Sequence, residues 1–355
     1  MFDGPFTSET DAAERLARVR LARSPRIGPV TFQEALQHFG SVRRACRELP
    51  PKIPVAAEDD LAREDRALAR IGGRFLVLGD SDYPAALAAL PDAPPVLSAI
   101  GDTGLLARPM LAIVGAREAS LAGRRFAADL AATLGRAGFV IVSGLARGID
   151  TAAHEAALPT GTVAVLAGGI DQIYPRQNEG LYRAIAGRGL LLAESPFGTP
   201  PIARSFPRRN RIVSGLSAGV IVIEAAAQSG SLITAQRALD QGREVFVVPG
   251  SPMDPRYAGS NNLIRQGAIL ARDANDIMGV FGKPQAACQP IEKSREAPRD
   301  STTAKVLRAL GSVPTAVDEL VRRCQVSAAT VAEVLTALEL EGRLERHRGN
   351  SVSLI

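Results

Sequence analysis

The chain has 355 residues, of which 46% are hydrophobic and 22% are charged, and its net charge is +5. This usage excludes a disordered or collagen-like protein, and roughly 100 to 200 residues per domain predicts two or three domains. The three cysteines are odd in number and show no CxxC spacing. We therefore expect neither a disulfide framework nor a zinc site, while the basic excess permits an anionic partner.

The apolar segments bear on the compartment. None of them reaches the ~20 residues that a membrane span needs. The start of the chain, MFDGPFTSETDAAERL, lacks the basic and then apolar pattern of a secretory signal. We expect a cytoplasmic protein without a membrane partner.

Residues 10 to 70 carry helical patterns with no strand-like run between them. They predict an N-terminal helical domain over residues 1–70. Between its first two helices, Ile27-Gly28-Pro29 predicts a tight hairpin of the helix-hairpin-helix type. Either the hairpin amides contact a nucleic-acid backbone, or the segment is a turn without a ligand. A single hairpin favours the second interpretation.

The pattern changes after residue 70. Residues 71 to 110 form a Pro-rich transition with one expected strand over 75–78, and from 111 apolar runs alternate with amphipathic segments. The runs are LAIVG, FVIVSG, TVAVLAGG, LLLAE, GVIVIEA and EVFVVPG. They predict an extended Rossmann-like α/β domain over residues 71–282, whose parallel sheet is covered on both faces. Ligands of such sheets bind outside the carboxyl ends of the strands.

The last part of the chain divides in two. Residues 283–302 are rich in Pro and charge and have little apolar periodicity, which indicates a linker. Residues 303–355 show three short helical patterns followed by two strands around a Gly-Asn turn. This order is typical of a winged helix.

A Rossmann-like sheet raises the question of a nucleotide cofactor. The sequence contains neither GxGxxG nor GxxxxGK[ST], so the loops that bind a dinucleotide or a triphosphate are missing. We expect no cofactor.

Three glycine loops follow strands of the predicted sheet. They contain Gly115 with Arg117, Ser143-Gly144 with Arg147, and Gly230-Ser231. Backbone amides and the helix dipole favour phosphate at such places, and arginine gives bidentate contacts. For any single loop a tight turn without a ligand is the simpler interpretation, but three loops on one edge favour a phosphate site.

The most distinctive segment is Arg204–Arg211, in which four arginines fall within eight residues. It directly precedes a strand, so we expect it to lie at the sheet edge beside the glycine loops and to suit a nucleic-acid backbone. Phe206 is positioned to stack a base, although 4% aromatic residues and no Trp exclude an extended stacking platform.

Few residues fit a catalytic role. His154 is the only histidine of the α/β domain and reads as structural, and Asp150 reads as a helix N-cap. Glu194 and Glu224 end strands near the expected pocket, where they would orient a base or an arginine, but their spacing does not make an acid/base pair. We expect neither catalytic residues nor a metal site.

These residues together resemble the DNA-processing protein A (DprA, or Smf) family. The resemblance covers residues 75 to 280 and rests on VGAR at 114 to 117, SGLARGID at 143 to 150, GGIDQIYP ending at Pro175 with Asn178 beyond it, Glu194-Ser195, FPRRNRIVSGLS at 206 to 217, Glu224-Ala225, SGSLITA at 229 to 235 and VFVVPG at 245 to 250. It implies a protein that binds and protects single-stranded DNA, forms a homodimer and loads the RecA recombinase during natural transformation. It does not imply an enzyme.

The candidate DNA-binding residues combine both lines of reasoning. The resemblance assigns the DNA pocket to Arg117, Arg208, Arg209, Asn210, Arg211, Gly230 and Ser231. The glycine loops, the basic segment and the strand ends add Gly115, Ser143, Gly144, Arg147, Phe206 and Glu224.

Two other functions remain open. Nucleotide phosphoribohydrolases of the same superfamily use a PGGxGTxxE loop, and this chain has Thr234 where that glutamate would stand. Their chemistry therefore lacks its carboxylate here. A transcription regulator would read DNA with the helix expected over 327 to 340, but that segment contains Glu333 and Glu339 and no Lys or Arg. We therefore expect the winged helix to be a protein-contact or accessory module.

Overall fold

The computed structural model describes residues 12–50, 52–284, 306–307, 309–310, 315–324, 326–340, 344–347 and 351–354. The chain divides into two compact units, Met1–Cys288 and Gln289–Ile355. Apart from residues 283 and 284, the expected linker lies outside the described residues. No helix in the described ranges is long and apolar enough to cross a membrane.

In the described residues from 12 to 70, the first unit contains helices and no strand, as expected. They are α1 (Ala12–Arg23), α2 (Pro29–Phe39), α3 (Val42–Glu48) and α4 (Glu58–Arg70). Leu21, Phe32 and Val42 form the centre of their core. Val19 of α1 and Leu68 of α4 instead pack with residues of the sheet. The helices therefore fold against the α/β part and not apart from it.

Polar contacts also join α1 to the sheet. Arg23 forms a buried ion pair with Glu64 of α4 at 3.0 Å. Its guanidinium also donates at 3.0 Å to the carbonyl oxygen of Glu194, which directly follows strand β6 (Leu190–Ala193). The amide of Phe197 donates to the Glu64 carboxylate at 3.1 Å. The segment that follows β6 is thus held by the N-terminal helices.

Nine strands form one sheet in the order β1-β2-β6-β5-β4-β3-β7-β8-β9. Their bounds are β1 (Gly73–Val77), β2 (Val96–Gly101), β3 (Met110–Gly115), β4 (Val140–Ser143), β5 (Thr162–Leu166), β6 (Leu190–Ala193), β7 (Gly219–Ile223), β8 (Glu244–Val247) and β9 (Ile269–Leu270). The strands from β6 to β9 are parallel, whereas β2 is antiparallel to both neighbours. The parallel sheet is confirmed for its centre, and β2 lies in the segment expected to be a transition.

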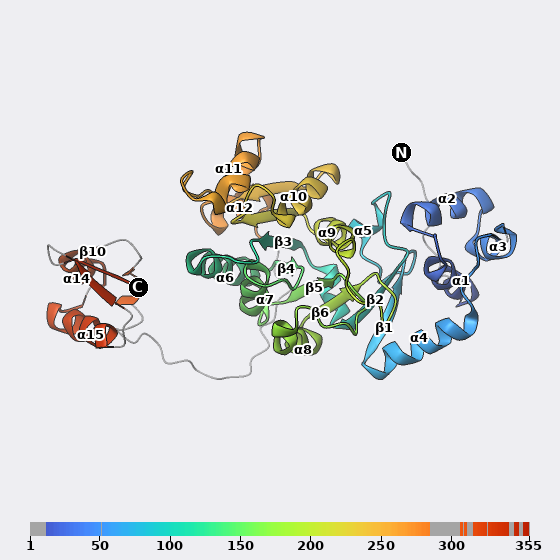
Figure 1. Ribbon diagram of the computed structural model, residues 1–355, viewed down its shortest axis with the longest axis horizontal. Helices are drawn as coiled ribbons and strands as arrows, with labels where there is room; N and C mark the ends of the chain where they lie inside the picture. Colours follow the sequence, from blue (N-terminus) through green and yellow to red (C-terminus); the bar gives the residue numbers. More distant parts are fainter. Residues whose placement is uncertain are drawn as a thin grey trace. The chain divides into compact units, whose positions relative to one another are not determined.

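Helices cover both faces of the sheet (Figure 1). One face carries α6 (Leu121–Arg136), α7 (Ile149–Ala157), α8 (Glu179–Arg188) and α12 (Ala274–Phe281). The other carries α5 (Ala85–Ala88), α9 (Ser205–Leu216), α10 (Gly230–Asp240) and α11 (Ala258–Arg265). Short 3₁₀ turns lie at η1 (Thr103–Ala107), η2 (Arg176–Asn178) and η3 (Pro255–Tyr257).

The strand order places the glycine loops together. β3 is flanked by β4 on one side and β7 on the other, so the chain winds away from β3 in both directions. Such a switch point leaves a crevice at the carboxyl ends of the central strands. The loops after β4, β3 and β7 all open onto that crevice.

The second unit contains a three-stranded sheet in the order β10-β12-β11. The elements whose bounds lie in the described residues are β10 (Thr315–Ala316), α14 (Val317–Cys324), α15 (Ala328–Leu340), β11 (Leu344–His347) and β12 (Ser351–Leu354). Val306, Leu320 and Leu335 are buried in its core. β11 and β12 pair antiparallel as the wing of the expected winged helix, and the Gly-Asn turn between them lies outside the described residues.

Candidate nucleic-acid interface

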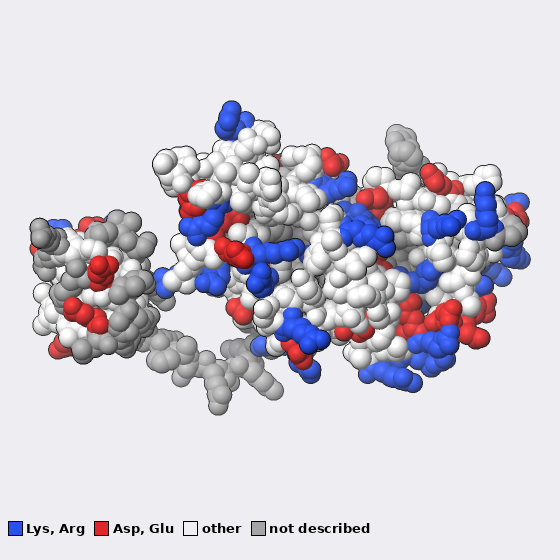
Figure 2. Space-filling view, viewed as in Figure 1, with Lys and Arg blue, Asp and Glu red and all other residues white. Residues whose placement is uncertain are grey.

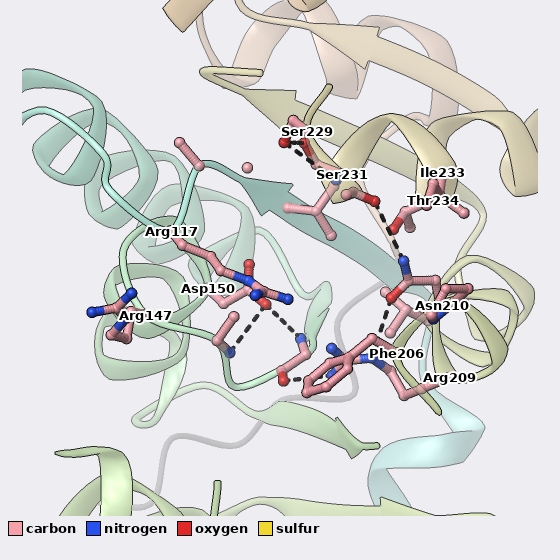
Figure 3. A pocket seen from close by; sticks show the side chains of 18 of the residues that line it. Arg117, Arg147, Asp150, Phe206, Arg209, Asn210, Ser229, Ser231, Ile233 and Thr234 are labelled. Carbon is pink, nitrogen blue, oxygen red and sulfur yellow. Dashed lines mark hydrogen bonds between the residues drawn. The ribbon is translucent and has the colours of Figure 1, made fainter. Parts of the chain in front are cut away.

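A cavity of about 800 Å³ opens at the carboxyl edge of the sheet. Its walls come from the loops after β3, β4 and β7 and from the first turns of α9 and α10. Figure 3 shows Arg117, Asn210 and Ser231 facing this space from three different segments. The arrangement expected for the three glycine loops is therefore present.

A second cavity of about 530 Å³ adjoins the first. Six residues line both cavities: Arg117, Gly144, Ala146, Arg147, Phe206 and Arg209. The far wall of the second cavity comes from 166–168 at the end of β5 and from 172, 174–177 and Pro201. The two cavities together make one groove across the ends of four strands, which we call the groove below.

Phe206 lies where the two cavities meet. The guanidinium carbon of Arg117 is 5.3 Å from the centre of its ring, within the range of a cation–π interaction. The ring of Tyr174 meets it edge-on at 5.6 Å between centres. Tyr174 is 50% exposed, and sequence reasoning did not select it, although it belongs to the GGIDQIYP segment.

Basic side chains dominate the groove lining. Arg117, Arg147 and Arg176 are exposed, and the carboxylates that line the groove are those of Glu118 and Asp150. Across the visible face, Lys and Arg alternate with Asp and Glu, also over α4 (Figure 2). The groove is thus locally basic on a surface of mixed charge.

Arg209 lies in the floor of the groove and not on its rim. It is only 7% exposed, and one guanidinium nitrogen donates to the carbonyl oxygens of Gly144 and Val165. Burial lowers the pKa of Arg209 to about 10, opposed by the charge of Asp150 and assisted by that of Arg117. Arg209, which the resemblance assigns to the DNA pocket, lines the groove but is buried, because it holds the ends of β4 and β5.

The other arginines of the basic segment do not line the groove. Arg211 is 6% exposed. It forms an ion pair with Glu194 and lies 3.7 Å from Asp92. Arg208 is exposed, and its guanidinium lies 3.9 Å from Glu194. The role expected for Glu194, orienting an arginine, is therefore met, whereas Arg211 is a partner in a buried ion pair.

The loop after β4 is fixed by buried side chains. The hydroxyl of Ser143 donates to the carbonyl oxygen of Ile113 at 2.6 Å, which turns it away from the groove. The Asp150 carboxylate accepts from the amides of Gly144 at 3.0 Å and Ala146 at 3.3 Å. Asp150 is therefore not the N-cap of α7, a position that Gly148 occupies. Burial raises the pKa of Asp150, against the charge of Arg209 and these hydrogen bonds.

His154 is structural, as expected. It is fully buried on α7, where its Nε2 accepts from the amide of Leu145 at 3.3 Å. Its Nδ1 lies 2.7 Å from the hydroxyl of Thr162, which donates to the carbonyl oxygen of Ile141. The hydrogen therefore sits on Nδ1. Burial lowers the pKa of His154 to about 3, so the ring is neutral at neutral pH.

The start of α10 forms the opposite wall. Ser229 is its N-cap and accepts from the amide of Ser231. The side-chain amide of Asn210 donates to the carbonyl oxygen of Gly230 at 3.4 Å and its oxygen accepts from Arg209 at 3.3 Å (Figure 3). The side-chain amide of Asn210 thus joins α9 to α10, while its oxygen is bound by the neighbouring residue of α9.

Glu224 lies behind the groove. It is 0% exposed, and its carboxylate accepts from the amide of Ser120 at 2.8 Å, from the Ser120 hydroxyl and from the Tyr257 hydroxyl at 3.0 Å. Burial and this hydrogen bond raise the pKa of Tyr257 to about 12. Glu224 supports the start of α6 and does not reach a ligand in the groove.

The structure therefore brings together most of the expected site. Gly115, Arg117, Gly144, Arg147, Phe206, Arg209, Asn210, Gly230 and Ser231 line the groove, whereas Ser143, Arg208, Arg211 and Glu224 do not. Thr234 lines it as well but is 2% exposed. Among the described residues there is no group of His, Cys, Asp and Glu that would hold a metal ion.

Comparisons with known proteins bear on the identity of this groove. A family model described as DNA recombination-mediator protein A matches residues 74–282. The chain belongs to this family. Models of the DprA-like N-terminal HHH domain and the DprA winged helix domain match residues 12–69 and 290–350. The resemblance inferred from the sequence is confirmed.

Individual relatives agree. Protein Smf of Escherichia coli (strain K12) is 40% identical over 292 residues, which cover 79% of this chain and 77% of that protein. The X-ray structure of DNA processing protein A from Streptococcus pneumoniae aligns with a TM-score of 0.60 at 36% identity, over 72% of this chain and 83% of that one. A Helicobacter pylori structure, described as giving the single-stranded DNA binding mode of DNA processing protein A, aligns with a TM-score of 0.55 at 34% identity, over 59% and 95%.

Proposed function

We propose that this protein binds single-stranded DNA in the groove. The observation that carries the proposal is the position of Phe206, an aromatic ring flanked by Arg117 and Tyr174 in the middle of a groove lined by arginines. Arg117 and Arg147 provide exposed guanidinium groups for phosphates. A ring at this place meets a base only if the base is unpaired and turned toward it, which favours a single strand over a duplex.

The roles beyond binding are further proposals. Membership of the recombination-mediator family supports a protein that covers incoming single strands and loads the RecA recombinase onto them during natural transformation. It also supports a homodimer. Nucleation of RecA on single-stranded DNA with and without this protein tests the first role, and the mass in solution tests the second.

An enzyme of the phosphoribohydrolase type is the weaker alternative. The position where such an enzyme needs a glutamate holds Thr234, which is buried. A threonine hydroxyl does not supply the carboxylate that this chemistry requires. We propose that the groove holds DNA without cleaving it.

The test is a salt-titrated binding measurement on the full chain with single-stranded and double-stranded oligonucleotides of the same sequence. We expect tighter binding to the single strand. The logarithm of the affinity should fall with the logarithm of salt by about 0.7 for each phosphate neutralised. Equal affinity for both forms, or binding that does not depend on salt, would exclude the proposal.

A further inference from the structure

The loop between β4 and α7 has a partner for each backbone polar group of residues 144–146. Gly144 donates to Asp150 and accepts from Arg209. Leu145 donates to His154 and accepts from Asn178 at 2.9 Å. The amide of residue 146 donates to Asp150, and its carbonyl oxygen accepts from the hydroxyl of residue 151 at 2.7 Å and from Asn178 at 3.4 Å. No amide of these three residues is therefore left to bind phosphate.

The conformation of this loop is imposed from outside. Leu145 has φ +56°, a left-handed conformation that costs free energy for a residue with a branched side chain. It persists because Leu145 is fully buried and both of its backbone groups are bound. The side chains around the loop, and not its own preference, decide how the next exposed residue, Arg147, is presented.

Asn178 has a special place among these side chains. It is buried at the end of η2, directly after the segment 174–177 that forms the far wall of the smaller cavity. Its side-chain amide donates to the Leu145 carbonyl oxygen and, at 2.9 Å, to the hydroxyl of Thr151. Asn178 thus joins two walls of the groove that are about thirty residues apart in sequence.

We propose that Asn178, acting with Thr151, is a positioning residue of the groove. It fixes the loop 144–148 against the segment 174–177 and thereby holds Arg147 in a position to bind a phosphate group of the DNA. Asn178 itself is buried and touches no ligand. This inference rests on the proposed binding of single-stranded DNA, and it adds a neutral residue outside the basic segment to the residues on which binding depends.

The test is the Asn178→Ala variant of the full chain in the same salt titration. We expect about tenfold weaker binding, because one charged contact with the DNA is lost. The slope of the logarithm of the affinity against the logarithm of salt should also decrease in magnitude by about 0.7, because Arg147 no longer neutralises a phosphate. No charge is removed by this change, so a merely structural role would lower the fraction of folded protein without altering the salt dependence.

A double-mutant cycle with Arg147→Ala sharpens the test. In the parent protein, Arg147→Ala should lower the affinity for single-stranded DNA about tenfold. In the Asn178→Ala background, the same change should lower the affinity less than twofold. The inference would be overturned if Arg147→Ala lowered the affinity equally in both backgrounds, or if Asn178→Ala left the salt dependence of binding unchanged. If the parent protein itself does not prefer single-stranded DNA, the proposed function fails instead.

Thr151 supplies a matched pair that keeps the test valid if Asn178→Ala does not fold. Thr151→Ser retains the hydroxyl that donates to Ala146, and Thr151→Val removes it with little change in shape. We expect Thr151→Ser to bind like the parent and Thr151→Val to show the reduced salt dependence. Identical binding by the two variants would contradict the inference.

Discussion

Arg209 and Gly144 fit together with no room for a methyl group between them. A Cβ atom added to Gly144 would lie 2.2 Å from a guanidinium nitrogen of Arg209, the nitrogen that donates to the Gly144 carbonyl oxygen. The absence of a side chain at this position therefore allows α9 to hold the end of β4. The glycine serves the protein's own arginine and not the close approach of a phosphate.

Gly144→Ala should consequently weaken both the fold and the groove. We expect a loss of about 1 to 3 kcal/mol in the free energy of unfolding, because the buried guanidinium must move, together with weaker DNA binding. Gly180→Ala is the matched control, since no atom lies within 4 Å of an added Cβ there and alanine is favoured in a helix. Urea unfolding of both variants measures the difference, and equal stability would contradict the packing described here.

Arg117 should behave in the opposite way. It is exposed and contacts Phe206, so Arg117→Ala should weaken binding to single-stranded DNA by roughly ten- to a hundredfold with a nearly unchanged melting temperature. Arg136→Ala removes an exposed arginine at the last turn of α6, outside the groove lining, and should leave affinity within twofold. A drop in melting temperature with unchanged affinity would remove Arg117 from the site.

Arg211 should matter for stability and not for DNA. Arg211→Ala leaves the carboxylate of Glu194 without its buried partner, a change that costs about 3 to 5 kcal/mol in comparable pairs. Affinity per folded molecule should stay within twofold of the parent. Chemical unfolding combined with DNA titration at a temperature where the variant is folded checks both statements, and a large loss of affinity in a stable protein would reverse the assignment.

His154 predicts a dependence of stability on pH. Burial holds its pKa in the folded protein at about 3, whereas the unfolded chain has a value near 6.5. Because the unfolded state alone takes up the proton, stability is fully present above about pH 6.5 and is lost as the pH falls toward 3, by about 1.4 kcal/mol per pH unit. The free energy of unfolding, measured from pH 7 to 4, should decrease less steeply in His154→Gln than in the parent. The difference should correspond to one proton fewer taken up on unfolding. Parallel curves for parent and variant would show that the ring is protonated in the fold.

The groove should not release bases from nucleotides. Incubation of the protein with nucleoside monophosphates, followed by chromatography, should yield no free base, since Thr234 supplies no carboxylate. Glu118 and Asp150 are the carboxylates that line the groove. Release that disappears in Glu118→Gln or Asp150→Asn would promote the hydrolase alternative.

Much of the fold follows from the sequence because its strands are long apolar runs in a regular order. The strand β2 was not predicted from the sequence because Pro94 and Pro95 directly precede it. Prolines normally indicate the absence of a central strand. Antiparallel pairing on both sides then places β2 inside the sheet, with every residue but Gly101 buried. Only tertiary pairing reveals this, since the local signals point to a loop.

The site was harder to predict because a run of basic letters does not say which side chains face a ligand. Successive residues of α9 point about 100° apart, so Arg209 and Arg211 lie on nearly opposite sides of the helix. Both are nevertheless buried, whereas Arg208 between them is exposed. Partners distant in sequence, such as Glu194 for Arg211, decide the rest. Asn178 was visible as part of a family motif, but nothing local connects it to the loop 144–148.

The contacts of Arg23 restrict the construction of chimeric proteins from this chain and its relatives. The N-terminal segment matches a family model of its own over residues 12–69, as would a domain that can be exchanged alone. Yet Arg23 reaches the carbonyl oxygen of Glu194, and Glu64 binds the amide of Phe197 in the segment that leads into α9. A chimera that takes its first helices from another member must therefore also take compatible residues at the end of β6. The segment that the family model matches therefore ends at residue 69, whereas the contacts that hold it extend to the residues after β6.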